Sequence, residues 1–289
     1  MPLPICVVTD SSVQFAHPSF PGRGLVHIVP IEILFQGNKF QGSEELKISS
    51  LPISPRPDAF PRLETPSEEV FRQVFSDLGQ SYRQIIGIFM SEQLSPVFKS
   101  AEKAANDLRG RVNIELIDSQ SISTGLGALV EAAAEAAEQG ISPSLIEKNV
   151  RDLTSRIYSV VCTPGLSYLH HNGFVDLGQA RIADMLGLYP IFSIEEGFLT
   201  PIEKGRSQRY IYEFFQEFID EFEQLQHIAL LQNVPQNNND IQMLREHVQE
   251  CYPQTLFTTH TLNLPIAALF GPKTFGLFVV EAVEKKTRL

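Results

Sequence analysis

Residues 114–138, IELIDSQSISTGLGALVEAAAEAAE, join a short apolar run to an alanine-rich run through a polar turn. The first run, Ile114 to Ile117, is typical of a buried strand, and Leu126 to Glu138 is typical of a helix. The same form, an apolar strand ending at a polar turn, recurs at Ile5 to Val8 and at Ile85 to Met90. Continuous apolar strands of this kind suit a parallel sheet covered on both faces. The repeated order therefore predicts an α/β fold with three layers, α/β/α.

Further helices are expected between and after these strands. Glu68 to Leu78 and Val97 to Leu108 carry apolar residues at helical spacing, and Ile141 to Tyr158 is expected to form one more helix. Thr65 and Ser95 stand before the first two helices as candidate N-caps, each followed by a proline. Ligands of such sheets collect at the carboxyl ends of the strands, so the polar turns are expected to converge there.

The pattern changes near residue 158. Strands are expected at Ser159 to Cys162, Ile191 to Ile194 and Ile228 to Gln232, helices at Ser207 to Gln226 and Asn239 to Cys251, and a loop at Gln236 to Asp240. The change of pattern predicts two α/β domains, residues 1–158 and residues 159–289.

The composition excludes several classes of protein. Acidic residues outnumber basic ones by 34 to 23, a net charge of -11 that opposes binding to nucleic acid. The N-terminus lacks a signal peptide's basic segment and no apolar run is long enough for a membrane span, so a cytoplasmic protein is expected. Cys6, Cys162 and Cys251 are widely separated, and the histidines lack ligand spacing. No disulfide framework, metal site or cofactor is expected.

The serine-rich turn of the opening segment allows two interpretations. Ser119 could be a nucleophile, but no GxSxG motif surrounds it and the sequence places no histidine beside it. A dinucleotide fingerprint is also missing, because the turn lacks the third glycine. In the alternative interpretation, Ser119, Ser121 and Ser123 satisfy backbone groups, while Gly125 and Gly127 let a helix pack closely. The residues by themselves favour this scaffold role.

Several segments, taken in order, resemble the DegV family of fatty-acid-binding proteins. They are VVTDSS (7–12), IVPIEILFQGNKFQG (28–42), IDSQSISTGLGALVEAA (117–133), LSYLHHNGFV (166–175), YPIFSIEEGFLTPIEKGR (189–206) and ALFGPKTFGLFVVE (268–281). Each motif is weak alone, but the ordered set is specific and covers nearly the whole chain.

The resemblance implies a two-domain α/β protein, with a mixed sheet in its smaller C-terminal domain. It also implies a long-chain fatty acid held in a tunnel between the domains, and no catalysis by the chain itself. In bacteria such proteins present the acid to a separate kinase. The ligand-binding residues that it implies are Ser95 as hydroxyl donor, Thr65 and Ser67 as loop donors, Asp118 and Ser119 as turn supports, and Arg206 as cation.

Three positions depart from the family's pattern. Leu63 stands where the family has a carboxylate-binding threonine, Phe174 replaces an arginine, and Leu269 replaces a histidine. A lost arginine and histidine would weaken the stabilisation of phosphate charge, so a role in phosphorylation is doubtful for this chain. The three changes together predict a more apolar head-group end of the pocket; independent drift is the alternative.

Two other functions stay open. One is a small-molecule transferase or hydrolase that uses the Ser119 cluster, which requires a base near this serine. The other is an interaction module whose cleft has lost its ligand.

Overall fold

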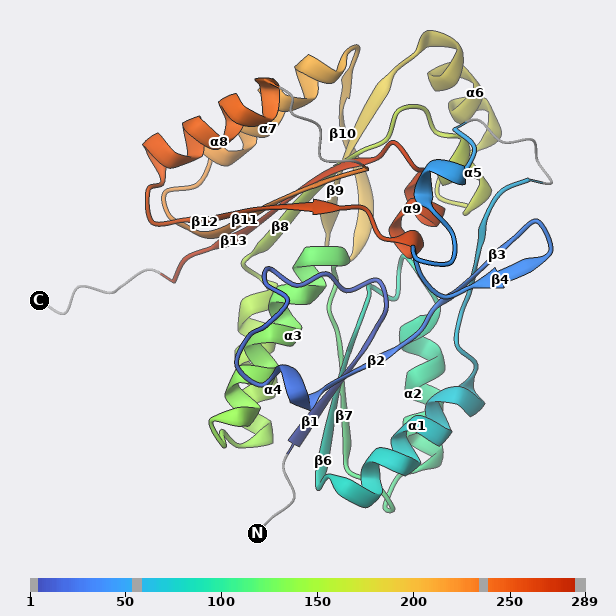
Figure 1. The fold of residues 1–289 in the computed structure, drawn as a ribbon, viewed down its shortest axis with the longest axis vertical. Helices are drawn as coiled ribbons and strands as arrows, with labels where there is room; N and C mark the ends of the chain where they lie inside the picture. Colours follow the sequence, from blue (N-terminus) through green and yellow to red (C-terminus); the bar gives the residue numbers. More distant parts are fainter. Residues whose placement is uncertain (1–4, 54–58, 234–238, 284–289) are drawn as a thin grey trace, which may run out of the picture.

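The computed structural model describes residues 5–53, 59–233 and 239–283, which form two layered halves (Figure 1). The first half is built on a four-stranded parallel sheet with the order β2-β1-β6-β7. Its strands are β1 (Ile5–Asp10), β2 (Val26–Val29), β6 (Gln84–Phe89) and β7 (Ile114–Asp118). The predicted parallel sheet is confirmed.

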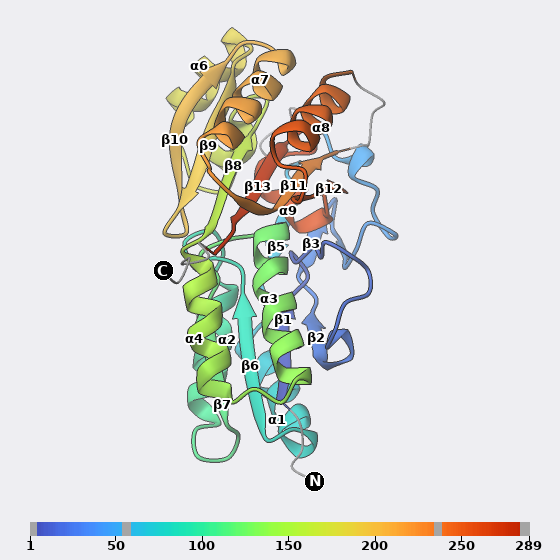
Figure 2. The same ribbon diagram turned by 90° about the vertical axis from the view of Figure 1, so that its left-hand side faces the viewer.

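Two pairs of helices cover this sheet. The helices are α1 (Glu68–Ser81), α2 (Val97–Asp107), α3 (Ser123–Glu138) and α4 (Pro143–Thr154). Helices α1 and α2 pack together on one face, and α3 and α4 pack together on the other (Figures 1 and 2). The three-layer prediction is therefore confirmed. Helix α1 shows why: its apolar stripe buries Phe71 and Phe75 completely, while its acidic residues face outward.

A small antiparallel sheet follows β2 and was not expected from the sequence. Its strands are β3 (Glu32–Phe35), β4 (Asn38–Phe40) and β5 (Arg62–Glu64), in the order β4-β3-β5. They are too short for alternation to be recognised. The Lys39 amine contacts a Glu32 carboxylate oxygen at 2.8 Å on the exposed side of this sheet. Two 3-10 turns occur in this part of the chain: Arg23–Leu25 precedes β2, and Ile48–Ser50 lies between β4 and β5.

The second half contains a six-stranded mixed sheet, in the order β10-β9-β8-β13-β11-β12. Its strands are β8 (Ile157–Cys162), β9 (Tyr189–Glu195), β10 (Phe198–Gly205), β11 (Leu225–Gln232), β12 (Leu256–Thr261) and β13 (Phe275–Glu281). Only β11 and β12 pair in parallel. The mixed sheet implied by the family resemblance is confirmed.

Helices cover both faces of this second sheet as well. They are α5 (Ser167–His171), α6 (Leu177–Leu186), α7 (Gln208–Asp220), α8 (Asn239–Cys251) and α9 (Leu264–Phe270). Helices α7 and α8 lie on one face, away from α5, α6 and α9 (Figure 1). The core beneath α9 is continuous with the core of the first half. The two halves therefore share one apolar core, and a separate core lies beneath α7 and α8.

Several predicted boundaries were wrong. The helix predicted to reach Tyr158 ends at Thr154, because Ile157 already pairs with Val280 in the sheet. The helix predicted to reach Gln226 ends at Asp220, because Leu225 pairs with Glu281. A boundary at residue 158 would fall inside β8. The division into two domains near that point stays a prediction, supported by the separate sheets.

The two predicted N-caps were also wrong. Thr65 stays outside α1, whose N-cap is Ser67; the Ser67 hydroxyl oxygen accepts a hydrogen bond from the Val70 amide at 3.4 Å. The chain is extended through β5, and Thr65 precedes a proline, which disfavours helical backbone. Pro96 is the N-cap of α2, although the Ser95 hydroxyl accepts a bond from the Val97 amide at 3.4 Å.

The last two residues of the loop predicted at 236–240 belong to α8, which begins at Asn239. Residues 236–238 lie outside the described part of the chain. Within the described ranges, none of the helices has the length and apolar character needed to cross a bilayer.

Gly127 tests the close packing of α3. A Cβ atom there would lie 1.9 Å from the backbone oxygen of Gln14. Glycine to alanine in a helix interior normally stabilises a protein by about 1 kcal/mol. We expect Gly127→Ala to lower the free energy of unfolding by about 2–4 kcal/mol instead, because the backbone at Gln14 must move to make room for the added methyl group. Chemical denaturation measures the change, with Gly24→Ala as control, since nothing lies within 4 Å of that position. A stabilised Gly127→Ala variant would contradict the packing.

Candidate functional site

Asp10 connects two of the polar turns at the carboxyl edge of the parallel sheet. Its side chain is completely buried at the end of β1. One carboxylate oxygen accepts a bond from the Ser12 amide at 2.9 Å, and the other accepts one from the Met90 amide at 2.8 Å. Burial raises the pKa of Asp10, and these hydrogen bonds oppose that shift. The turns after β1 and β6 are thus held together by one carboxyl group.

Two further contacts join this edge to the second half. The Ser91 hydroxyl donates to the backbone oxygen of Gly197 at 2.9 Å, which attaches the β9–β10 turn to the end of β6. The Asn263 amide donates to the backbone oxygens of Ser11 and Ser12 at 3.3 and 2.8 Å. Asn263 is also the N-cap of α9. The strand ends therefore position both the hairpin and α9.

The serine-rich turn after β7 is fixed by its own hydrogen bonds. The buried Ser119 hydroxyl donates to the Ser121 backbone oxygen at 3.0 Å and accepts from the Ser121 amide at 3.1 Å. An Asp118 oxygen accepts from the amides of Glu92 and Gln120 at 3.3 and 3.1 Å. Burial raises the pKa of Asp118. These bonds agree with the scaffold role predicted for Ser119, which stays a prediction, and Asp118 braces the same turn.

The three predicted hydroxyl donors lie in the loops that open α1 and α2. Ser95 is buried, and its amide donates to the Ser91 backbone oxygen at 3.1 Å. Thr65 is half-buried, and within the described residues its hydroxyl makes no hydrogen bond. Ser67 is exposed and its oxygen caps α1. None of the three hydroxyl groups donates a hydrogen bond within the described residues, but Ser67 is exposed to solvent, whereas Ser95 is buried and Thr65 is half-buried.

Several buried hydroxyls at this edge have no partner among the described residues. They are those of Thr9, Ser121 and Thr124. Buried polar groups are usually hydrogen-bonded, so this edge retains capacity for bound water or a polar ligand.

An apolar groove begins near the β9–β10 turn. It has a volume of about 690 Å³ and runs between α6 and the β9–β10 hairpin. Ile182 and Ala183 of α6 form one wall, and Phe192 and Leu199 of the hairpin form the other. Leu199 lies two residues from Gly197, which contacts Ser91. One end of the groove therefore approaches the polar strand ends. All its lining residues belong to the second half, so the predicted tunnel between domains stays a prediction.

The three altered positions gather around α9. Leu269 is buried within that helix, and Phe174 stacks on its neighbour Phe270 with ring centroids 6.5 Å apart. Leu63 is half-buried in β5, which packs against α9. Phe174 also lines the apolar groove. An aromatic side chain therefore forms part of the groove wall where the family pattern has an arginine.

Arg206 does not lie with the hydroxyl donors. It is exposed and follows the last residue of β10, whereas the Ser91 contact is made at the strand's other end. With a rise of about 3.3 Å per residue, this strand separates the two points by roughly 25–30 Å. One carboxylate cannot contact both Ser95 and Arg206. The order of residues in the sequence could not show this separation, because it does not indicate which end of the β9–β10 hairpin lies against the strand ends.

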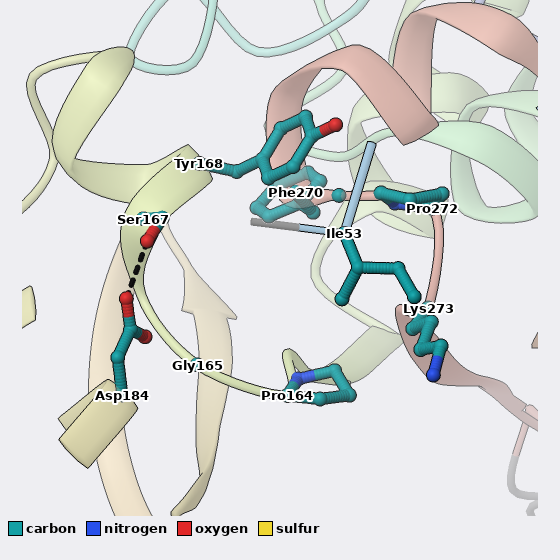
Figure 3. Close-up of a pocket in the computed structure, with 10 residues that line it drawn as sticks. Ile53, Pro164, Gly165, Ser167, Tyr168, Asp184, Phe270, Pro272 and Lys273 are labelled. Carbon is teal, nitrogen blue, oxygen red and sulfur yellow. Dashed lines mark hydrogen bonds between the residues drawn. The ribbon is translucent and has the colours of Figure 1, made fainter. Parts of the chain in front are cut away.

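A second, smaller cavity lies beside α5 and α9 (Figure 3). Its volume of about 20 Å³ suits a single water molecule. The Ser167 hydroxyl donates to Asp184 at one side of it. On the other side, the Tyr168 hydroxyl donates to the Pro52 backbone oxygen at 2.6 Å. This cavity is too small for a lipid chain.

Sequence reasoning missed the residues that organise the edge. Asp10 ends β1 and Ser91 lies two residues beyond β6, which was a usable signal, but nothing local connects Asn263 to the first turn. In the part of the chain that the structure describes, no three histidine, cysteine or acidic side chains are arranged to hold a metal.

The fold and these contacts define a two-lobed α/β protein with polar strand ends beside an apolar groove. A family model described as "Uncharacterised protein, DegV family" matches residues 4–282. The chain belongs to the DegV family. A DegV domain-containing protein of Caldanaerobacter subterraneus subsp. tengcongensis is 30% identical over 205 residues, which cover 71% of this chain and 72% of the relative.

Solved structures agree with this assignment. A DegV family protein from Thermus thermophilus, described by its fatty acid binding, superposes with a TM-score of 0.82 at 25% identity, covering 96% of this chain and all of that one. The Streptococcus pneumoniae Fatty Acid Kinase (Fak) B3 protein, loaded with linoleic acid, has a TM-score of 0.82 at 17% identity, with 96% and 100% covered. The second match shows the shared fold.

Asp10→Ala tests the interlock of the strand ends. The change leaves the amides of Ser12 and Met90 without their acceptor, and each unpaired buried amide costs about 1–3 kcal/mol. We expect the free energy of unfolding to fall by about 2–5 kcal/mol in chemical denaturation. Asp152→Ala, at an exposed position, serves as control. Equal stability of the two variants would rule out the interlock.

Proposed function

We propose that this chain binds one long-chain fatty acid, with the acyl chain in the groove between α6 and the β9–β10 hairpin. The apolar groove carries the proposal, because its volume of about 690 Å³ is within the range of small-molecule sites. Burying about 14 methylenes at ~0.8 kcal/mol each contributes roughly 11 kcal/mol before association costs. The fatty acids named for the Thermus thermophilus and Streptococcus pneumoniae proteins support the same ligand class.

The carboxylate is proposed to lie at the strand ends, near Ser95 and Thr65. An unpaired buried charge is costly, so donors must meet it. The Ser95 and Thr65 hydroxyl protons are free, and the groove approaches this edge at the β9–β10 turn. Asp118 and Ser119 are proposed to hold the neighbouring turn without touching the ligand. Arg206, at the far end of β10, is proposed to take no part in carboxylate binding.

We infer that the chain acts as a binding protein and not as an enzyme. The Ser119 hydroxyl both donates and accepts within its own turn, which leaves it poorly placed for attack on a substrate. A separate kinase is the partner that the Fak B3 likeness suggests. Phe174 and Leu269 bring no charge to the groove or to α9, so phosphorylation of the bound acid is expected to be slow or absent.

The first test is the lipid content of the purified full-length chain. Mass spectrometry of the organic extract should give a long-chain fatty acid at close to one per chain. Ala183→Phe fills the buried wall of the groove, so bound acid should fall more than about tenfold, which corresponds to 1.4 kcal/mol. Leu145→Phe, on the exposed side of α4, is the control. No acid in the wild type, and none taken up when it is added, would refute the proposal.

Ser95→Ala tests the head-group end separately. Hydrogen bonds to charged groups contribute about 1.5–3 kcal/mol, so the Kd for a fatty acid should rise roughly tenfold to a hundredfold. The Kd for the matching fatty alcohol should change less, because its head group is uncharged. Calorimetric titration of delipidated protein measures both. An equal loss for acid and alcohol would place the carboxylate elsewhere.

A further inference from the structure

The outer helices of the second half carry a cysteine, a histidine and an aspartate in contact. Cys251 and His247 lie one turn apart on α8, and Asp220 is the last residue of α7. Cys251 is exposed, and its sulfur lies 3.9 Å from Nδ1 of His247. Nε2 of the same ring lies 2.6 Å from Oδ1 of Asp220. Helices α7 and α8 lie on the sheet face opposite α6, so this cluster is separate from the groove (Figure 1).

The Asp220 carboxylate determines which ring nitrogen of His247 carries the proton. A carboxylate only accepts hydrogen bonds, so Nε2 must donate, and in the neutral ring Nδ1 keeps its lone pair. That lone pair is directed at donors: the Gln216 amide, 3.2 Å away, and the Cys251 thiol. This is the arrangement that a general base beside a thiol requires.

The geometry of the cluster is held by the packing of the two helix ends. The Tyr252 hydroxyl donates to the backbone oxygens of Ile219 and Phe222 at 3.0 and 2.8 Å. These bonds tie the end of α8 to the end of α7, on either side of Asp220. The His247 side chain is only 18% exposed, which restricts its rotation, while Cys251 is an exposed residue.

The structure assigns Cys251 as a site of thiol–disulfide exchange with a small disulfide from solution, with His247 as its general base and Asp220 as the residue that orients the base. The Cys251 sulfur attacks one sulfur of the disulfide as its proton passes to Nδ1 of His247. The new S–S bond forms, the old one breaks, and the departing thiolate takes the proton from His247. Cys251 is oxidised to the mixed disulfide, and half of the reagent is reduced to a thiol.

Two features shape this reaction. The sulfur lies at the C-terminal end of α8, where helix carbonyls carry partial negative charge, so proton transfer should accompany attack. The other two cysteines are buried; burial raises the pKa of the Cys6 thiol to about 12 and raises that of Cys162 further. Reaction at a single sulfur is therefore expected.

The test uses the full chain and hydroxyethyl disulfide, an uncharged probe, at neutral pH. Intact-mass and peptide mass spectrometry should show one added mercaptoethanol group, on Cys251, and none in Cys251→Ser. The rate should fall about tenfold in His247→Ala, and added imidazole should restore part of it. Asp220→Asn should also slow the reaction, because its amide can donate to Nε2 and move the ring proton to Nδ1.

Arg209→Ala, elsewhere on α7 and exposed, is the matched control and should react at the wild-type rate. Thermal unfolding confirms that each variant is folded. Equal rates for wild type and His247→Ala, or a slow His247→Ala variant that imidazole fails to rescue, would overturn the assignment. Modification at Cys6 or Cys162 would overturn it as well. Lipid content is measured on the same samples. A failure of the fatty-acid proposal can then be distinguished from a failure of this one.

Discussion

The buried carboxyl group of Asp10 is the contact on which the arrangement of the strand ends depends. It accepts hydrogen bonds from the backbone amides of Ser12 and Met90, and so fixes the turns after β1 and β6 to each other. A fully buried carboxyl group is costly, as its raised pKa reflects. The cost is offset because both turns would otherwise leave buried amides unpaired. The unfavourable burial of the Asp10 carboxyl group is therefore tolerated because it fixes the shape of the turns at the carboxyl edge of the sheet.

That edge in turn positions the second half. Backbone oxygens of the first turn accept hydrogen bonds from the side-chain amide of Asn263, the N-cap of α9. In the second turn, the Ser91 hydroxyl donates to the backbone oxygen of Gly197 and so holds the β9–β10 turn. Both contacts connect backbone on one side to a side chain on the other, so they depend on the turns keeping their shape. The groove begins beside the hairpin turn, and α9 carries Leu269. A change in the strand-end turns would therefore reach the proposed acyl site without touching it.

The sequence predicts the strand-turn-helix order well, because buried parallel strands such as Ile85 to Met90 and amphipathic helices such as Asn239 to Cys251 are signalled locally. It predicts helix ends less well: whether Ile157 continues α4 or enters a strand is decided by Val280, far along the chain. The small sheet around Glu32 depends on the pairing of β3 with the distant β5, and the placement of Arg206 depends on how the β9–β10 hairpin packs against the strand ends. The donors Ser95 and Thr65 come from loops that could be recognised, while the groove requires the packed structure.

The departures from the family pattern have a common physical consequence. Phe174 is part of the groove wall and stacks on Phe270, whose neighbour Leu269 is buried in the same short helix. On the correspondence that the resemblance implies, apolar side chains stand here in place of a cationic arginine and a titratable histidine, both of which would have required polar partners or solvent. The apolar interior can then continue from the groove into α9. Such continuity favours ligands held by their chains, and in the proposed binding mode the hydroxyl groups of Ser95 and Thr65 are the main polar contacts for the head group.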